Sequence, residues 1–159
     1  MRSRRGIVAA SFVLVMLVLS ASAAAVPVYY AADETIVRYV LDEMELEYEY
    51  LLDEDGDPIW TFTHLGILVT IIPYDEGAPG RYASLLFYTG WATEGSISLT
   101  LINDWNRSAR FGRAYVDDLG DPVIELDLLM VGGVTTDTLR EYITVFVQAA
   151  SSLGVALQL

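Results

Sequence analysis

The spacing of the apolar residues changes from a helical period to a strand period near the start of this chain. After Asp33, apolar residues recur at the spacing of one helix face between positions 36 and 41, which predicts a helix of about ten residues capped by Asp33. The sequence EMELEYEY then alternates strictly, which predicts a strand with one buried face. Its outer face would be a row of carboxylates, formed by Glu43, Glu45, Glu47 and Glu49.

The rest of the chain repeats this change of period. DEDGDP predicts a turn, and IWTFTH, GILVTIIPY and RYASLLFYTGW predict three further strands. EGSISLTLINDWNRSA returns to helical spacing, with Ile97, Leu101 and Trp105 on one face. Two more strands joined by LGDP follow, and then a last helix capped by Thr135 or Thr136.

The predicted fold is α+β, in the order α-β-β-β-β-α-β-β-α. Short connections favour antiparallel neighbours, and the helices are expected to pack on one face of the antiparallel sheet. No internal repeat is expected outside the N-terminal segment.

The first residues have the three parts of a secretory signal peptide. MRSRR is basic, GIVAASFVLVMLVLS is uncharged, and ASAAAVP supplies small residues for cleavage. We therefore expect a signal peptide over residues 1–25, a linker over 26–32 and one domain over 33–159, with the protein exported to the periplasm or secreted. The alternative is a membrane anchor formed by residues 6–32 that is not cleaved.

The charge of the chain limits its partners. The formal net charge is −13 at pH 7, and every basic residue is an arginine. Such a chain is a poor match for nucleic acid, whose binding depends on neutralising phosphates, and for anionic lipid surfaces. We expect neither as a partner, beyond the N-terminal anchor that the alternative allows.

Most catalytic chemistries lack their residues. The chain has no Cys and no Lys, and its one histidine is His64, so Ser–His catalysis and the common zinc sites are not expected. Walker and G-x-G-x-x-G loops are absent from the sequence. DEDGD has alternating aspartates but lacks the glycine position and closing glutamate of a calcium loop. No catalytic residue, metal or cofactor is predicted.

Three arginines lie close together in the second half of the chain, at Arg107, Arg110 and Arg113. In a structural interpretation they neutralise nearby carboxylates, Trp105 fills the core, and the neighbouring asparagines bond to main chain. In a functional interpretation they present a patch to an acidic peptide or carboxylate ligand.

The same region resembles the YbjN family, bacterial proteins catalogued as sensory transduction regulators. The resemblance is carried by N-x-W-N, by RFGRAYVDDLGD and by the strand and Thr-capped helix that follow, and YEYLLDEDGDPIW fits the family's first hairpin. It implies a fold similar to type III secretion chaperones, in an α+β domain that often dimerises and binds extended peptide. The family-motif residues, for which we expect a structural role, are Asn103, Trp105, Asn106, Phe111, Gly112 and Gly120.

The sequence therefore predicts an exported, non-enzymatic domain that binds a protein or peptide, as a regulator or chaperone-like module, with a homodimer as one form. Partner-binding candidates are Glu45 and Glu47, which would select basic segments at a sheet edge, and the three arginines. The alternative is a small-ligand-binding protein or carboxylate-based enzyme that uses the Arg107, Arg110 and Arg113 patch.

Overall fold

A computed structural model describes residues 25–93 and 97–159 of the chain. The expected signal peptide lies outside the described residues, apart from Ala25. The elements, in chain order, are α1 (Glu34–Glu43), β1 (Tyr48–Leu52), β2 (Pro58–His64), β3 (Ile67–Ala78), β4 (Arg81–Gly90), α2 (Leu99–Ser108), β5 (Arg113–Val116), β6 (Pro122–Leu129) and α3 (Thr136–Leu157). This order confirms the predicted α+β class.

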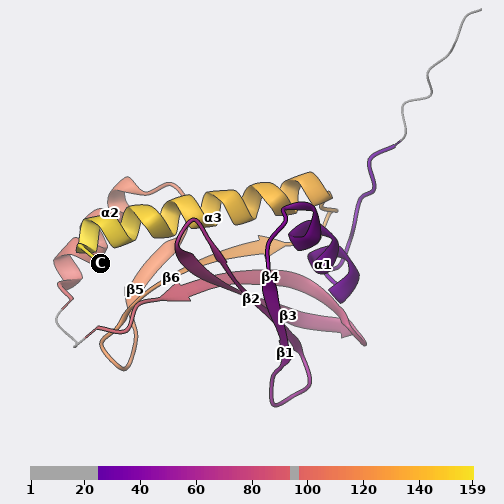
Figure 1. Ribbon diagram of the computed structural model, residues 1–159, viewed down its shortest axis with the longest axis horizontal. Helices are drawn as coiled ribbons and strands as arrows, with labels where there is room; N and C mark the ends of the chain where they lie inside the picture. The colour runs from indigo at the N-terminus through magenta and orange to yellow at the C-terminus, as the bar shows by residue number, and fades with distance from the viewer. Residues whose placement is uncertain (1–24, 94–96) are drawn as a thin grey trace, which may run out of the picture.

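The strands form one twisted antiparallel sheet in the order β1-β2-β3-β4-β6-β5. The helices lie along one side of it, with the long helix α3 crossing several strands (Figure 1). Strand side chains on that side are buried against α3: Phe87 of β4 packs 5.9 Å from Phe146, centroid to centroid. Burying one apolar side chain of this size stabilises the fold by about 1.5–3 kcal/mol relative to leaving it exposed. None of the described helices lies over the other face of the sheet (Figure 1).

Strand β1 begins later than the sequence predicts. Helix α1 continues to Glu43, whose carboxylate bonds to Arg140 of α3, and Glu45 then turns the chain at φ 54°. The alternation from Glu43 to Glu47 therefore belongs to a helix end and a turn, and β1 starts at Tyr48. The expected row of four strand glutamates is wrong for this reason.

Helix α2 buries a face adjacent to the predicted one. Ile102 and Trp105 are buried, whereas Leu101 is 46% exposed. Ile102 and Trp105 are three residues apart, which is also a helical repeat, so the sequence pattern alone fits both choices. Ser98 occupies the N-cap position without a side-chain capping bond.

The chain contains a helix–strand–turn–strand repeat that the sequence analysis missed. The first copy is α1-β1-β2 and the second is α2-β5-β6, and both turns have the sequence D-x-x-G-D-P, at 53–58 and 117–122. The two hairpins lie at opposite edges of the sheet, with β3 and β4 between them, and α3 contacts both α1 and α2. The expectation of no internal repeat is therefore wrong.

The two repeated turns are built in the same way. The first aspartate accepts main-chain N–H groups two and four residues ahead, at 3.0 and 2.8 Å for Asp53 and at 2.9 and 2.9 Å for Asp117. Gly56 and Gly120 have φ of 89° and 88°, a conformation that glycine adopts without steric cost. Both turns project to the side of the sheet away from the helices (Figure 1).

Residues 29–32, within the segment expected to be a linker, are attached to the domain at two points. Tyr29 exchanges main-chain hydrogen bonds with Val134 at 2.7 and 2.8 Å, and Ala32 does so with Tyr82 at 2.8 and 2.9 Å. Ala32 is 1% exposed. The chain is therefore fastened to the start of β4 and to the loop before α3. Within the described ranges, no helix is both long enough and apolar enough to cross a membrane.

Candidate interaction surface

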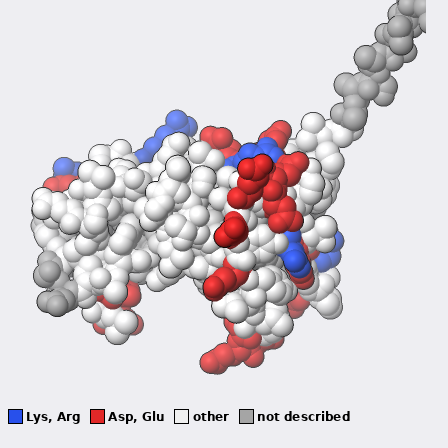
Figure 2. Space-filling model, in the orientation of Figure 1, with Lys and Arg blue, Asp and Glu red and all other residues white. Residues whose placement is uncertain are grey.

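The face of the sheet without helices carries several exposed apolar side chains. The strand register places Leu51, Leu68, Tyr74 and Leu129 on this face, and each is about half exposed or more. In Figure 2, which has the orientation of Figure 1, the outline below the sheet is hollowed between two lobes. We call this side of the molecule the helix-free face.

A hollow of about 800 Å³ follows the edge strand β1. Glu45, Glu47 and Glu49 line it together with Leu68 and side chains of β2. The two partner-binding candidates Glu45 and Glu47 therefore meet at one place, although they lie in the connection before β1 and not in a strand. Acidic residues also gather over this part of the molecule in Figure 2.

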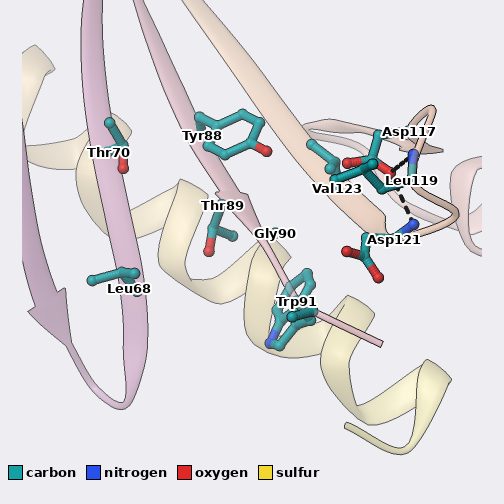
Figure 3. A pocket seen from close by; sticks show the side chains of 11 residues that line it. Leu68, Thr70, Tyr88, Thr89, Gly90, Trp91, Asp117, Leu119, Asp121 and Val123 are labelled. Carbon is teal, nitrogen blue, oxygen red and sulfur yellow. Dashed lines mark hydrogen bonds between the residues drawn. The ribbon is translucent and has the colours of Figure 1, made fainter. Parts of the chain in front are cut away.

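A second hollow, of about 280 Å³, lies at the other end of the helix-free face (Figure 3). It is lined by Tyr88 and Trp91 from the end of β4, by Leu68 from β3, and by Asp117 and Asp121 from the β5–β6 turn. Leu68 lines both hollows, so they lie next to each other on the sheet. We call the combined surface the trough.

Burial and charge act together on Tyr88 in this second hollow. Desolvation raises the pKa of the Tyr88 phenol above its usual value, and the nearby carboxylates of Asp117, Glu125 and Asp121 raise it further. In Figure 3 its hydroxyl points toward the β5–β6 turn. The phenol is therefore protonated at neutral pH and can act as a hydrogen-bond donor.

A third hollow, of about 340 Å³, lies on the same face around Arg113, Glu125 and Asp127. Arg113 forms an ion pair with Glu125, which holds the pKa of the guanidinium above its ordinary value. The Tyr115 hydroxyl donates to the same carboxylate at 2.6 Å. Burial and this hydrogen bond raise the pKa of Tyr115 to about 12.

The side chains of the three clustered arginines lie on three different surfaces of the domain. Arg107 pairs with Asp104 at 3.3 Å on the exposed side of α2. Arg110 lies 5.1 Å from the centre of the Phe111 ring and lines a hollow of about 240 Å³ between α2 and α3. Arg113 belongs to the helix-free face. The structure does not bring these side chains into one pocket.

The family-motif residues mostly hold α2 against β5 and α3. Trp105 is 5% exposed, and its indole N–H donates to Ser152 Oγ at 3.2 Å. The Asn106 side chain donates to Ala114 O at 2.9 Å and accepts from Ala114 N at 3.0 Å. Asn103 is exposed.

The remaining motif residues lie in the connections. Phe111 is 43% exposed beside Arg110. Gly112 has φ 84°, and a Cβ there would lie 2.9 Å from the Cδ1 atom of Ile124. Gly120 forms the second repeated turn.

Sequence reasoning missed Tyr88, Trp91, Asp117 and Asp121 as neighbours. The second D-x-x-G-D-P sequence was the available signal, because it marks the turn that supplies both aspartates. Among the described residues, no three His, Cys, Asp or Glu side chains come together so as to hold a metal ion.

Comparison with known proteins identifies similar sequences and folds. A family model named YbjN, with the description "Putative bacterial sensory transduction regulator", matches residues 33–159. None of the curated proteins compared with the chain matches it.

Solved structures show the same fold at low identity. The YbjN protein of E. coli, described as "a putative transcription regulator", has 16% identity and a TM-score of 0.62, over 80% of this chain and 90% of that one. An uncharacterized protein of Methanothermobacter thermautotrophicus has 15% identity and a TM-score of 0.56, over 79% and 96%. The Yersinia pestis type III secretion chaperone SycH, solved in complex with a stable fragment of YscM2, has 18% identity and a TM-score of 0.52, over 75% and 97%. The chaperone-like fold is thereby confirmed.

Proposed function

The chain belongs to the YbjN family, and from this premise we propose that it is an exported, non-enzymatic domain that binds an extended segment of a partner protein. It would act as a regulator or as a chaperone-like module. Export is supported by the basic, apolar and small-residue parts of residues 1–25.

The observation that carries this proposal is the trough on the helix-free face. Its floor is uncharged: threonines of β2 and β3 line it together with Leu68, which is 54% exposed between the two hollows. Its ends are acidic, with Glu45 and Glu47 at one end and Asp117 and Asp121 at the other. Exposed apolar side chains bounded by polar residues are typical of protein-binding sites, and the charge favours a partner segment with basic residues.

The edge strand gives a second means of binding. Among the described strands, β1 pairs only with β2, so its outer main-chain groups are available to an added strand. The glutamates beside it would oppose pairing with unsuitable strands. SycH, which shares the fold, is described in complex with a fragment of another protein, and this supports a protein partner here.

The alternative of a small-ligand protein or enzyme built on the arginine patch has less support. It requires Arg107, Arg110 and Arg113 to act together, and the structure places them at separate surfaces. A homodimer remains part of the proposal, as one form in which the domain would be found.

Photo-crosslinking in cells tests the proposed function. A photoreactive phenylalanine analogue is placed at Leu68 in the trough, and at Val155 as the matched control, because Val155 is 76% exposed on α3. We expect crosslinks to a different protein from position 68 and none from position 155. Crosslinks that are absent at both positions, or equal at both, would contradict the proposal.

A further inference from the structure

The smaller hollow of the trough combines aromatic side chains with carboxylates, which together suit a cation. We propose that the hollow formed by Tyr88, Trp91, Asp117 and Asp121 is a socket for one basic side chain, arginine or lysine, of the bound partner segment. This inference rests on the proposed function and names what the trough would recognise. Cations are attracted to aromatic ring faces and form charge-assisted hydrogen bonds with carboxylates.

The two carboxylates are held in place before any ligand arrives. Asp117 Oδ1 accepts the main-chain N–H groups of Leu119 and Asp121, each at 2.9 Å. Asp121 Oδ1 accepts the N–H of Thr93 at 2.6 Å and its hydroxyl at 2.9 Å. In the described part of the chain these bonds use one oxygen of each carboxylate, so the Oδ2 atoms are left to accept from a ligand.

The socket contains no positive charge of its own. The residues that line it include aspartates and aromatic, aliphatic and hydroxyl side chains, and none of those described is basic. Its volume of about 280 Å³ falls just under the roughly 300 Å³ at which pockets for small molecules begin. It therefore fits one side chain better than a larger ligand.

In the first copy of the repeat, a side chain of the protein itself occupies the position that corresponds to the socket. There Asp57 is equivalent to Asp121, and its Oδ1 accepts the hydroxyl of Tyr82 at 2.7 Å. Tyr82 is 3% exposed, so the protein's own side chain closes this turn. The open turn and the closed turn have the same D-x-x-G-D-P sequence, and this gives a control within the same molecule.

The test compares matched double variants of the purified protein. Asp117→Asn/Asp121→Asn keeps an oxygen acceptor at each position, so the β5–β6 turn should still form, but it removes the charges at the socket. Asp53→Asn/Asp57→Asn makes the same change of net charge at the closed turn. A third variant, Leu119→Arg, places a cation beside the socket at a residue that is 81% exposed and should compete with a ligand.

The probes are three capped peptides of alternating Thr and Val that differ only at the central residue, which is arginine, lysine or norleucine. Binding is followed by NMR at the indole N–H of Trp91. We expect the arginine and lysine peptides to shift this signal and to bind roughly tenfold more tightly than the norleucine peptide. This preference should be lost in Asp117→Asn/Asp121→Asn and in Leu119→Arg, and retained in Asp53→Asn/Asp57→Asn.

Other outcomes would overturn the inference. Equal binding of the basic and norleucine peptides excludes a cation socket, as does an equal loss of binding in the two Asn double variants, which would indicate bulk charge alone. Absence of any Trp91 shift also overturns it. In each of these cases crosslinking from Leu68 in cells still tests the proposed function. The socket and the proposed function can therefore fail separately.

Discussion

Asn106 at the end of α2 binds both main-chain groups of Ala114 in β5. Its amide nitrogen donates to the Ala114 carbonyl and its oxygen accepts the Ala114 N–H. An asparagine can do this because its side chain carries a donor and an acceptor side by side. One residue thereby supplies, on the edge of β5 that faces away from β6, the pairing that another strand would give.

Replacing Asn106 with alanine should destabilise the domain clearly. Ala114 is 4% exposed, so its main-chain groups would lose their partners away from water, at a cost of about 1–3 kcal/mol. Urea unfolding measures the change. Asn103→Ala, at an exposed position of the same helix, is the control and should change the free energy of unfolding by less than about 0.5 kcal/mol. Equal effects of the two variants would contradict this role.

Alanine at Gly112 should cost more than alanine at Gly56. Both glycines have positive φ, which costs an L-residue about 1–2 kcal/mol. The new Cβ at Gly112 would also lie 2.9 Å from Ile124, whereas nothing lies within 4 Å at Gly56. Crowding of a packed site adds about 1–3 kcal/mol. Thermal unfolding of the two variants should separate them, and a larger loss at Gly56 would be inconsistent with this packing.

The domain should lose stability at alkaline pH because several tyrosines, above all Tyr82 and Tyr115, have a raised pKa and keep their protons when folded. The pKa of Tyr115 is raised to about 12, and that of Tyr82 is raised by burial and by its bond to Asp57. The unfolded chain releases these protons near pH 10, so stability is complete below that value and falls as the pH rises toward 12.

Unfolding measured between pH 8 and pH 11.5 checks this dependence. Tyr115→Phe removes one of the two groups and should flatten part of the alkaline decline. Tyr74→Phe, at a residue that is 49% exposed, serves as the control for the loss of one phenol. A pH profile that is the same for all three proteins would exclude Tyr115 as a source.

Charge reversal should distinguish the trough from the arginines as the partner surface. Glu45→Arg/Glu47→Arg places two cations at the acidic end of the trough, and we expect it to abolish crosslinking from Leu68. Arg110→Glu alters the hollow between α2 and α3 and should leave that crosslink intact. Circular dichroism must first show that both variants are folded. Loss of the crosslink only in Arg110→Glu would indicate that the partner binds on the α2–α3 side instead.

The order of helices and strands could be predicted from the sequence because one face of each element is buried. Burial imposes a period of two on strands and about 3.6 on helices, and the segments after Asp33 follow these periods closely. The start of β1 could not be predicted in this way. Glu43 is the last residue of a helix, and its carboxylate pairs with Arg140 of α3, which is distant in sequence.

The socket was beyond sequence reasoning for a similar reason. Trp91 and Asp121 are brought together by the pairing of β4 with β6, which depends on the whole sheet. For the arginines, closeness in sequence was misleading in the opposite way, because it suggested a closeness in space that the structure does not have. Arg110 and Arg113 are neighbours in sequence, but Gly112 turns the chain between them, and they face different sides of the domain.

The attachment of residues 29–32 determines how the domain would be oriented on any support that held its N-terminus. The chain enters beside α1 and the start of α3, on the helix side of the sheet (Figure 1). The trough opens on the opposite side. A tether at the N-terminus would therefore turn the helices toward the support and the binding face outward, so that tethering would not hide the surface through which we propose that partners are bound.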